Sequence, residues 1–195
     1  MVMRRFVWMA AVLAARCGSG ADAGAPERTM VVDSALPPEE SLRRLRDGLP
    51  EPAALDGAPS RDALVRGLFE RLRAQDTAAV VAMTLTRAEF GWLYYPELAA
   101  ASPTPALDPR LMWTLLRLES EKGLNRLFQR LGGVDVGFEG YRCEALPRTE
   151  GRNRLWEDCE VRLGSPPEDL AATRLFGTII ERDGRYKFVS FKTDL

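Results

Sequence analysis

The sequence predicts an α+β fold in which N-terminal helices pack on one face of a curved four-stranded antiparallel sheet. Two observations support this. Apolar residues recur at helical spacing before residue 132, and the remainder has strand-like runs divided by turn sequences. We divide the chain into a signal peptide (1–23), a Pro- and Ala-rich tether containing a short helix (24–59) and a single α+β domain (60–195).

The first 23 residues have the composition of an export signal. Arg4 and Arg5 precede an uncharged apolar run, Phe6 to Ala15, which is too short for a bilayer span of roughly 20 residues. Ala21-Asp22-Ala23 has the small-x-small pattern of a cleavage site. We therefore expect a bacterial protein exported to the periplasm or the cell exterior.

Cys17 lies just after the apolar run, where a lipoprotein carries its lipid. Lipoprotein signals resemble Leu-small-small-Cys, but here Ala14, Ala15 and Arg16 precede the cysteine. Because Arg16 departs from that pattern, cleavage after Ala23 is preferred. We expect membrane attachment only if Cys17 is lipidated.

Two cysteines, Cys143 and Cys159, remain once the leader is removed. A hairpin centred near Gly151 sets them opposite each other on antiparallel strands, close enough to bridge. The predicted disulfide would add about 3 kcal/mol through chain entropy; two unpaired buried thiols are the alternative. No metal site is expected, because two cysteines without histidine supply half a ligand set.

Helix signals begin in the tether and continue into the domain. A short helix is expected between Pro37 and Gly48, because early acids and late arginines suit helix polarity. Ser60 caps the first domain helix and Asp76 a short second one. Thr86-Arg87-Ala88-Glu89 matches the capping box of a third helix, which we expect to stop at the following proline.

A long helix is expected after the Pro-rich loop that follows. Asp108-Pro109 combines an N-cap with proline at the first helical position, and Gly132-Gly133 ends the helix. The phase of its apolar residues slips near Gly123, which predicts a bend or a break there.

Four strands in two hairpins follow the helices. Gly140 lies at a change of phase in the first strand, which predicts a bulge. Asp183-Gly184 between the last two strands predicts a type I′ turn, with Ile179 opposite Phe188. These two strands are apolar on both faces, which favours a central place in the sheet or a second covering surface.

The order of these elements resembles that of the nuclear-transport-factor-2-like (cone-shaped) superfamily. The resemblance covers roughly residues 61–195 and rests on four segments: Asp62-Ala63-Leu64-Val65, Asp76-Thr77-Ala78-Ala79-Val80, Phe176-Gly177-Thr178-Ile179 and Tyr186-Lys187-Phe188-Val189. It implies a sheet curled around the long helix to make a pocket. Members include enzymes, binding modules and pocketless partners, so the resemblance leaves function open.

Composition excludes several kinds of chemistry. The chain has no histidine, which rules out a Ser-His-Asp triad, a Cys-His pair and a histidine-ligated metal. The formal net charge of −1 gives no reason to expect nucleic acid. Neither a phosphate-binding loop nor a dinucleotide fingerprint is present, and no cofactor is expected.

The candidate ligand site is an aromatic cluster with one carboxylate. Its members are Glu89, Trp92, Tyr94, Tyr95 and Trp113. Aromatic rings with polar handles can line a small-molecule pocket, and plain core packing is the alternative. Three further carboxylates are candidate acids or bases within such a cone, with ordinary solvated side chains as the alternative: Glu119, Asp135 and Glu139.

These observations favour a binding domain for a small apolar ligand or for an envelope protein. One alternative is a cone-fold isomerase or dehydratase, which would need a carboxylate base with a raised pKa in an apolar cavity. Another is a structural envelope protein without a ligand. We lean against an enzyme because common catalytic residue patterns are missing from the sequence.

Overall fold

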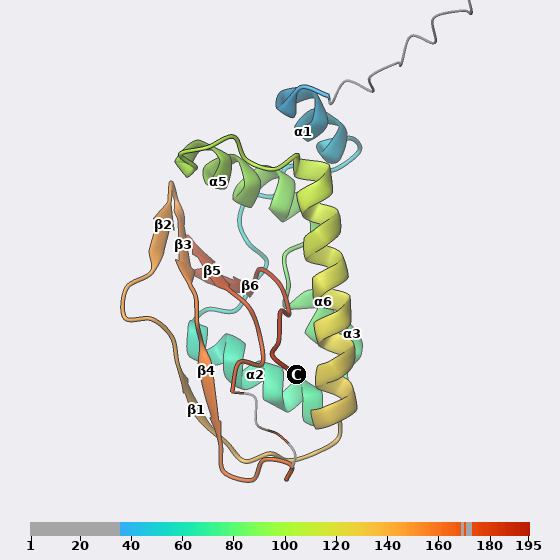
Figure 1. Ribbon diagram of the computed structural model, residues 1–195, viewed down its shortest axis with the longest axis vertical. Coiled ribbons are helices and arrows are strands. Elements are labelled where there is room, and N and C mark those ends of the chain that lie inside the picture. The colour runs from blue at the N-terminus through green and yellow to red at the C-terminus, as the bar shows by residue number, and fades with distance from the viewer. Residues whose placement is uncertain (1–35, 169, 171–172) are drawn as a thin grey trace, which may run out of the picture. The chain divides into compact units, whose positions relative to one another are not determined.

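Helices precede strands along the chain in the computed structural model, which describes residues 36–168, 170 and 173–195 (Figure 1). The predicted α+β class is confirmed. Residues 36–195 form one unit, and none of the helices in its described part is long and apolar enough to span a membrane. The predicted signal peptide, its cleavage site and Cys17 lie outside the described residues.

The segment predicted as a tether is folded from residue 36 onward. It contains α1 (Pro38–Arg46), which has two glutamates in its first turn and arginines in its last. Leu45 and Leu55 are both buried. The described part of this segment therefore belongs to the same unit as the rest of the domain.

The next two helices, α2 (Arg61–Arg73) and α3 (Thr77–Ala82), begin at the predicted caps. The side-chain oxygens of Ser60 and Asp76 each accept a backbone N–H three residues further on, at 3.0 Å. α2 directs five large apolar side chains into the core: Leu64, Val65, Leu68, Phe69 and Leu72. The predicted N-caps of both helices are confirmed.

Three short helical segments follow without interruption: α4 (Arg87–Glu89), η1 (Phe90–Tyr94) and α5 (Tyr95–Ala101). The Thr86 hydroxyl accepts from the Glu89 backbone N–H, and the Glu89 carboxylate accepts from the Thr86 backbone N–H. The predicted capping box is therefore confirmed.

The predicted stop at Pro96 is wrong, and a π-helical turn explains how the chain continues. Tyr95 donates its backbone N–H to the carbonyl of Phe90, five residues back. In the same register Pro96 would face the carbonyl of Gly91, but proline has no N–H. Arg46 of α1 supplies the missing donor, with its Nε 2.9 Å from the Gly91 carbonyl oxygen.

The long helix α6 (Pro109–Leu131) starts at the predicted cap, where Asp108 accepts two backbone N–H groups at 3.0 Å. It passes through Gly123 without the break that the sequence suggested. Gly123 instead lets the chain after the last strand cross close to the helix, since a Cβ there would collide with the Phe191 carbonyl. The glycine therefore serves a close approach between two backbones.

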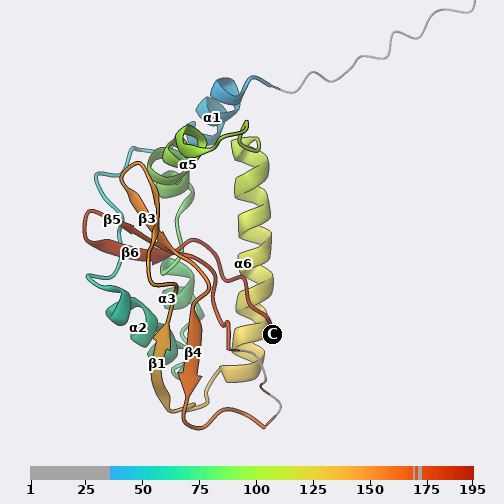
Figure 2. The ribbon, with the colours of Figure 1, turned by 60° about the vertical axis from the view of Figure 1, so that its left-hand side comes forward.

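The strands form two sheets, rather than the single curved four-stranded sheet that was predicted (Figures 1 and 2). The smaller sheet pairs two strands and the larger has the order β2-β3-β5-β6, all antiparallel. The strands are β1 (Phe138–Arg142), β2 (Arg148–Glu150), β3 (Asn153–Trp156), β4 (Glu160–Leu163), β5 (Ile179–Arg182) and β6 (Arg185–Phe188).

The split arises because both arms of the first predicted hairpin are interrupted between the two sheets: β1 ends at Arg142 and β2 begins at Arg148, and β3 ends at Trp156 and β4 begins at Glu160. Pro147 has no N–H to donate, and Asp158 adopts a φ of +47° that an extended strand does not allow. The predicted disulfide between Cys143 and Cys159 is confirmed, with an S–S distance of 2.01 Å. It joins the two chain segments where β1 and β4 stop pairing and β2 and β3 have yet to begin.

Two local predictions for the strands are confirmed. Asp183 and Gly184 have φ of +52° and +75°, as a type I′ turn requires, and Ile179 pairs with Phe188. The register of β1 shifts before Gly140, where a bulge was expected.

The larger sheet contributes to two separate cores, because neighbouring residues of a strand point to opposite faces. Trp156, Ile179 and Phe188 join residues of α2, α3 and the C-terminal half of α6 in the first core. Leu155 and Ile180 join residues of α1, η1 and α5 in the second core. Helices therefore lie against both faces of this sheet, where the sequence predicted helices on one.

The outer edge of β6 is covered by two other segments of the chain. Tyr186 forms a bridge with Ala58, and Phe188 forms one with Thr84. Leu85 also donates its N–H to the Phe188 carbonyl at 3.0 Å. These contacts protect the edge strand and fix the segment between α3 and α4 against the sheet.

Candidate functional site

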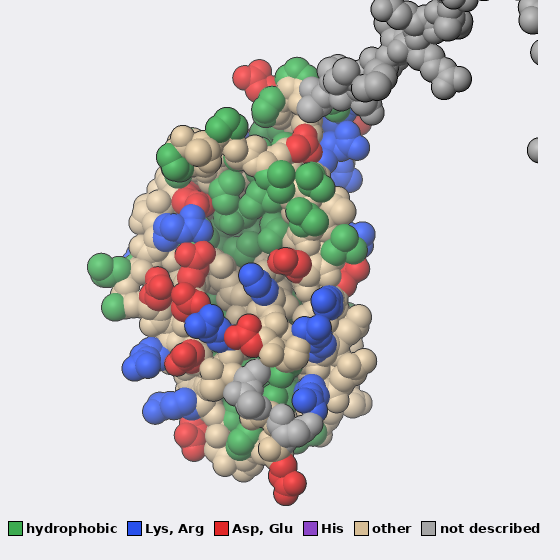
Figure 3. Space-filling view, in the orientation of Figure 1, with side chains coloured by type: hydrophobic (Ala, Val, Ile, Leu, Met, Phe, Trp, Pro, Cys, Tyr) green, Lys and Arg blue, Asp and Glu red, His purple; other side chains and the backbone are tan. Residues whose placement is uncertain are grey.

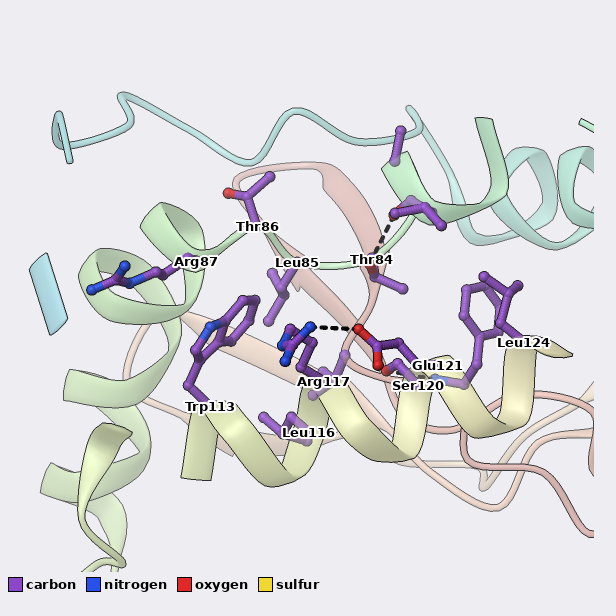
Figure 4. A pocket seen from close by; sticks show the side chains of 14 residues that line it. Thr84, Leu85, Thr86, Arg87, Trp113, Leu116, Arg117, Ser120, Glu121 and Leu124 are labelled. Atoms are coloured by element: carbon purple, nitrogen blue, oxygen red, sulfur yellow. Dashed lines mark hydrogen bonds and ion pairs between the residues drawn. The ribbon is translucent and has the colours of Figure 1, made fainter. Parts of the chain in front are cut away.

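A pocket of about 390 Å³ opens between α6, the segment 81–87 and the residues that follow β6 (Figure 4). Its wall is predominantly apolar. The larger apolar residues that line it are Leu85, Trp113, Leu116, Leu124, Val189 and Phe191.

The pocket lies at the seam between the two cores. Leu85 and Val189 belong to the second core, with Trp113 packed against it, whereas Leu124 and Phe191 belong to the first. The two cores meet beside the covered edge of β6, where side chains from both reach the pocket surface. The apolar lining is thus an extension of the packing that holds the fold together.

One face of α6 supplies a row of pocket residues at intervals of three or four positions, as one helix face requires: Trp113, Leu116, Ser120 and Leu124. The Trp113 ring is held by Phe90, with ring centroids 5.3 Å apart. Ser120 accepts the Phe191 backbone N–H at 3.2 Å and ties the last segment of the chain to the helix. These contacts hold the helix wall and the chain that crosses it in fixed positions.

Charged side chains lie at the rim of the pocket. Arg117 and Glu121, one turn apart on α6, form an ion pair at 2.6 Å with both side chains about half exposed. Figure 4 shows the Arg117 guanidinium reaching toward Glu121, while Arg87 extends past Trp113 and away from this pair. Within the described part of the chain the Arg87 guanidinium has one long hydrogen bond, 3.4 Å to the Arg44 carbonyl, and no ion pair.

Glu89, the one carboxylate of the predicted cluster, does not line this pocket. It is 2% exposed and accepts hydrogen bonds from the backbone N–H groups of Thr86 and Asp56 at 2.7 and 2.8 Å. Lys187 of β6 completes its coordination, with Nζ 2.8 and 3.1 Å from the two carboxylate oxygens. This geometry is that of a buried structural ion pair.

The charged state of Glu89 follows from the same contacts. Burial disfavours the carboxylate, but the hydrogen bonds from Lys187 and from the two backbone N–H groups outweigh it and hold the pKa of Glu89 below its ordinary value. A general base for an isomerase needs the opposite shift. Glu89 therefore does not fit the carboxylate base of the alternative hypothesis.

The predicted aromatic residues gather around Phe90 rather than around a ligand cavity. The ring centroids of Tyr94, Tyr95 and Trp113 lie 5.8, 5.8 and 5.3 Å from that of Phe90. Tyr94 and Tyr95 are buried, which raises the pKa of both phenols, and the Tyr95 hydroxyl donates to the Leu107 carbonyl at 2.8 Å. For these two residues core packing is what the structure shows.

The remaining two members of the predicted cluster have different surroundings. The Arg46 guanidinium stacks over the half-buried Trp92 ring, 4.1 Å from its centroid. Trp113 alone among the five lines the pocket. Sequence reasoning therefore found one residue of the pocket but missed Leu85, Leu116 and the other apolar residues, because a helix face and two distant segments supply them.

Sequence reasoning also missed a polar network behind η1. Asn153 and Arg182 both donate to the Leu93 carbonyl, at 3.0 and 3.2 Å. Arg182 also binds Glu97 at 3.0 Å and Asn153 at 2.9 Å. One signal was present in the sequence: Lys187 and Arg182 are cations in strands whose two faces were both expected to be covered.

The other carboxylates named as candidates are exposed. Glu119 and Glu139 lie on the surface. Asp135 accepts from the Gly137 backbone N–H and from Arg73, and both contacts hold the pKa of Asp135 below its ordinary value. Among the residues described, no cluster of three or more His, Cys, Asp and Glu side chains is arranged to hold a metal ion.

A second hollow of about 560 Å³ lies between the loop 102–107, the start of α6 and β2. Figure 3 shows hydrophobic side chains gathered on the face between α5 and the upper part of α6, where this hollow opens. It is larger but more open to solvent than the pocket at the seam, and its wall is less apolar. The seam pocket is therefore the better candidate for holding a small molecule.

Comparisons of the chain with protein-family models, with curated proteins and with solved structures gave no match. The resemblance in element order to the cone-shaped superfamily was therefore not tested by them. What the chain does must be inferred from the geometry of its own pocket and surface.

Proposed function

We propose that the chain is an exported, disulfide-bonded binding domain whose seam pocket holds a small apolar ligand. The observation that carries this proposal is the pocket itself, with a volume of about 390 Å³ and predominantly apolar walls. Small-molecule sites commonly measure 300–1,000 Å³ and combine such walls with a few polar groups. Ser120, Arg117 and Glu121 are the polar groups that α6 contributes.

The surroundings of the pocket support binding without large rearrangement. Leu85 is fixed by its hydrogen bond to Phe188, and Phe191 by its hydrogen bond to Ser120. Trp113 is packed on Phe90. A preformed site loses less free energy to ordering when a ligand enters.

Export is part of the proposal and has two supports. The N-terminal sequence has a basic start, a short apolar run and a cleavage pattern. The disulfide between Cys143 and Cys159 suits an oxidising compartment. The intact mass of the protein recovered from an exporting bacterial host tests the cleavage and the disulfide together. We expect the mass of the chain cleaved after Ala23, less two hydrogens for the disulfide. A lipid mass on Cys17 would contradict cleavage after Ala23.

We also keep membership of the nuclear-transport-factor-2-like superfamily as a proposal. Its supports are the order of helices before an antiparallel sheet and the packing of α6 against both cores. The division of the strands into two sheets departs from a single curled sheet. An experimental structure in which β1 and β4 continue the larger sheet would favour membership, and one that keeps two sheets would count against it.

Native mass spectrometry of the protein expressed from the full chain is the simplest test of whether the pocket holds a small molecule. We expect a non-covalent small-molecule adduct on the wild-type protein that is lost in Leu116→Trp, because the larger side chain would fill the pocket. Leu118→Trp is the matched control, since Leu118 is half exposed on the same helix and does not line the pocket. An adduct that persists in Leu116→Trp would place the ligand elsewhere.

Binding of an envelope protein is a second candidate, favoured by the outer face of α6. Leu111, Leu115 and Leu118 are each about half exposed and repeat at intervals of four and three, so they form one apolar stripe. A triple Leu→Ser variant of this stripe should then lose co-purifying envelope proteins while it keeps the small-molecule adduct. Unchanged co-purification would remove this candidate.

A further inference from the structure

We propose that the ligand of the seam pocket is a single-chain amphiphile with an anionic head, of which a medium-chain fatty acid is the simplest example. This inference rests on the proposed function, because it specifies what enters that pocket. The apolar wall would bury the chain, and Arg117 would bind the head at the rim.

The balance of charge at the rim favours an anion. The ionisable residues that line the pocket are Arg87, Arg117 and Glu121, which gives the rim a formal charge of +1. Arg87 is not neutralised by an ion pair in the described part of the chain. A guanidinium next to apolar surface binds carboxylate or phosphate through charge-assisted hydrogen bonds.

Arg117 is the better placed of the two arginines. Figure 4 shows its guanidinium among the lining side chains, between Trp113 and Glu121, whereas Arg87 extends away from them. Its present partner Glu121 is about half exposed, as is Arg117 itself. Because exposed helix ion pairs contribute little free energy, a ligand carboxylate can share or replace Glu121 at small cost.

The position of Arg117 on α6 also orients the ligand. Leu116 and Trp113 lie beside it toward the N-terminal end of the helix, and Ser120 and Leu124 lie toward the other end. A head at Arg117 leaves the chain in contact with the apolar row on either side. Affinity should therefore depend on chain length as well as on the charge of the head.

The inference is tested by expressing the full chain, purifying the resulting protein and titrating it with three ten-carbon probes. Trp fluorescence and calorimetry are the readouts. The probes are decanoate, decanol and decyltrimethylammonium. We expect decanoate to bind most tightly, with about fourfold gain for each methylene added from octanoate upward. High ionic strength should weaken decanoate more than decanol.

Variants of the rim residues distinguish binding of the ligand's head group from binding of its hydrocarbon chain. Arg117→Gln should lower the affinity for decanoate by about tenfold, because one charge-assisted hydrogen bond is lost. The affinity for decanol should stay unchanged. Glu121→Gln should strengthen decanoate because it removes a competing carboxylate. Arg110→Gln is the matched control, as Arg110 lies two turns away on the same side of α6 and does not line the pocket.

Three outcomes are distinguishable. A preference for decanoate that Arg117→Gln abolishes supports the inference. Equal binding of decanoate and decanol, unaffected by Arg117→Gln but lost in Leu116→Trp, overturns the anionic head and leaves the proposed pocket function standing. Absence of binding by all three probes to the folded wild-type protein overturns the proposed function as well.

Discussion

The two faces of the larger sheet bury very different side chains. One face presents Trp156, Ile179 and Phe188 to apolar residues of α2, α3 and α6. The buried charged residue on this face is Glu181, which lies 3.5 Å from the half-exposed Arg154 beside it. The opposite face presents Leu155 and Ile180 together with four buried polar residues: Glu150, Asn153, Arg182 and Lys187. The first face meets regular helices, and the second meets the irregular segment α4–η1–α5.

The difference shows what an irregular helix requires. Its π turn and its proline leave carbonyl groups without helical donors, and Arg46 and Arg182 donate to two of them. Its first turn is held by Glu89, whose charge is matched by Lys187. The apolar face is stabilised by burial of side chains, whereas the polar face exchanges part of that burial for hydrogen bonds that fix one local conformation.

Replacing Lys187 should be among the most destabilising changes to this polar face. Lys187→Met leaves the Glu89 carboxylate buried without its cation, and we expect a loss of about 3–5 kcal/mol in the free energy of unfolding. Urea denaturation of the purified protein measures it. The double variant Lys187→Met/Glu89→Gln should recover much of the loss, because it removes both charges.

The matched change on the apolar face is Phe188→Ala, the next residue of the same strand. Its expected loss is similar, about 3–5 kcal/mol, because it leaves a cavity. The two variants should respond differently to acid. Lowering the pH should reduce the loss of stability in Lys187→Met, because Glu89 becomes protonated and no longer carries an unpaired charge. The loss in Phe188→Ala should stay the same. Equal acid responses would contradict the assignment of the Glu89–Lys187 ion pair to the polar face.

Loss of the disulfide should have the next largest effect. Cys143 and Cys159 are separated by 16 positions, and a loop of this size is worth about 3 kcal/mol in chain entropy. The paired variant Cys143→Ser/Cys159→Ser should lose this amount by urea denaturation. Added reductant should destabilise the wild-type protein and leave the paired variant unaffected; the opposite result would place the stabilisation elsewhere.

A smaller effect is expected at Gly123, where the first core meets the last segment of the chain. Gly123→Ala should cost about 1–3 kcal/mol, because its Cβ meets the Phe191 carbonyl and a backbone must shift. Gly67→Ala in α2 is the control: its Cβ would meet the flexible end of Arg71, so it should be neutral or slightly stabilising. Equal melting temperatures for the two variants would contradict the close approach of the Phe191 backbone to α6 at Gly123.

The pH dependence of the wild-type protein should show the polar face directly. The pKa of Glu89 is lowered in the folded protein from an unfolded value near 4.5. Its contribution to stability is therefore complete above pH 4.5 and falls as the pH drops through the folded pKa. In Glu89→Gln the free energy of unfolding should therefore depend less on pH in acid than it does in the wild-type protein. Urea denaturation at a series of pH values measures this dependence.

Local signals in the sequence were enough to predict much of the fold. Ser60, Asp76, Thr86 and Asp108 cap helices, and Asp183-Gly184 forms its hairpin, because each signal acts over only a few residues. The disulfide was also predictable, because β1 and β4 pair in a register that sets Arg142 opposite Glu160 and so brings Cys143 opposite Cys159.

What could not be predicted depends on residues that are far apart in the chain. Arg46 and Gly91 meet across 45 positions, and Glu89 and Lys187 across 98. Without such partners Pro96 could only be interpreted as a helix stop. The seam pocket was missed for the same reason: α6, the segment 81–87 and the end of the chain supply its walls, and no local pattern joins them.

The central claim is that the seam between the two cores holds an apolar small molecule. Titration with the neutral apolar fluorophore N-phenyl-1-naphthylamine tests it directly in the wild-type protein, Leu116→Trp and Leu118→Trp. We predict a saturable rise in probe fluorescence for wild type and Leu118→Trp, and its loss in Leu116→Trp with the fold unchanged by circular dichroism. Equal binding by all three proteins, or binding by none, would contradict the claim.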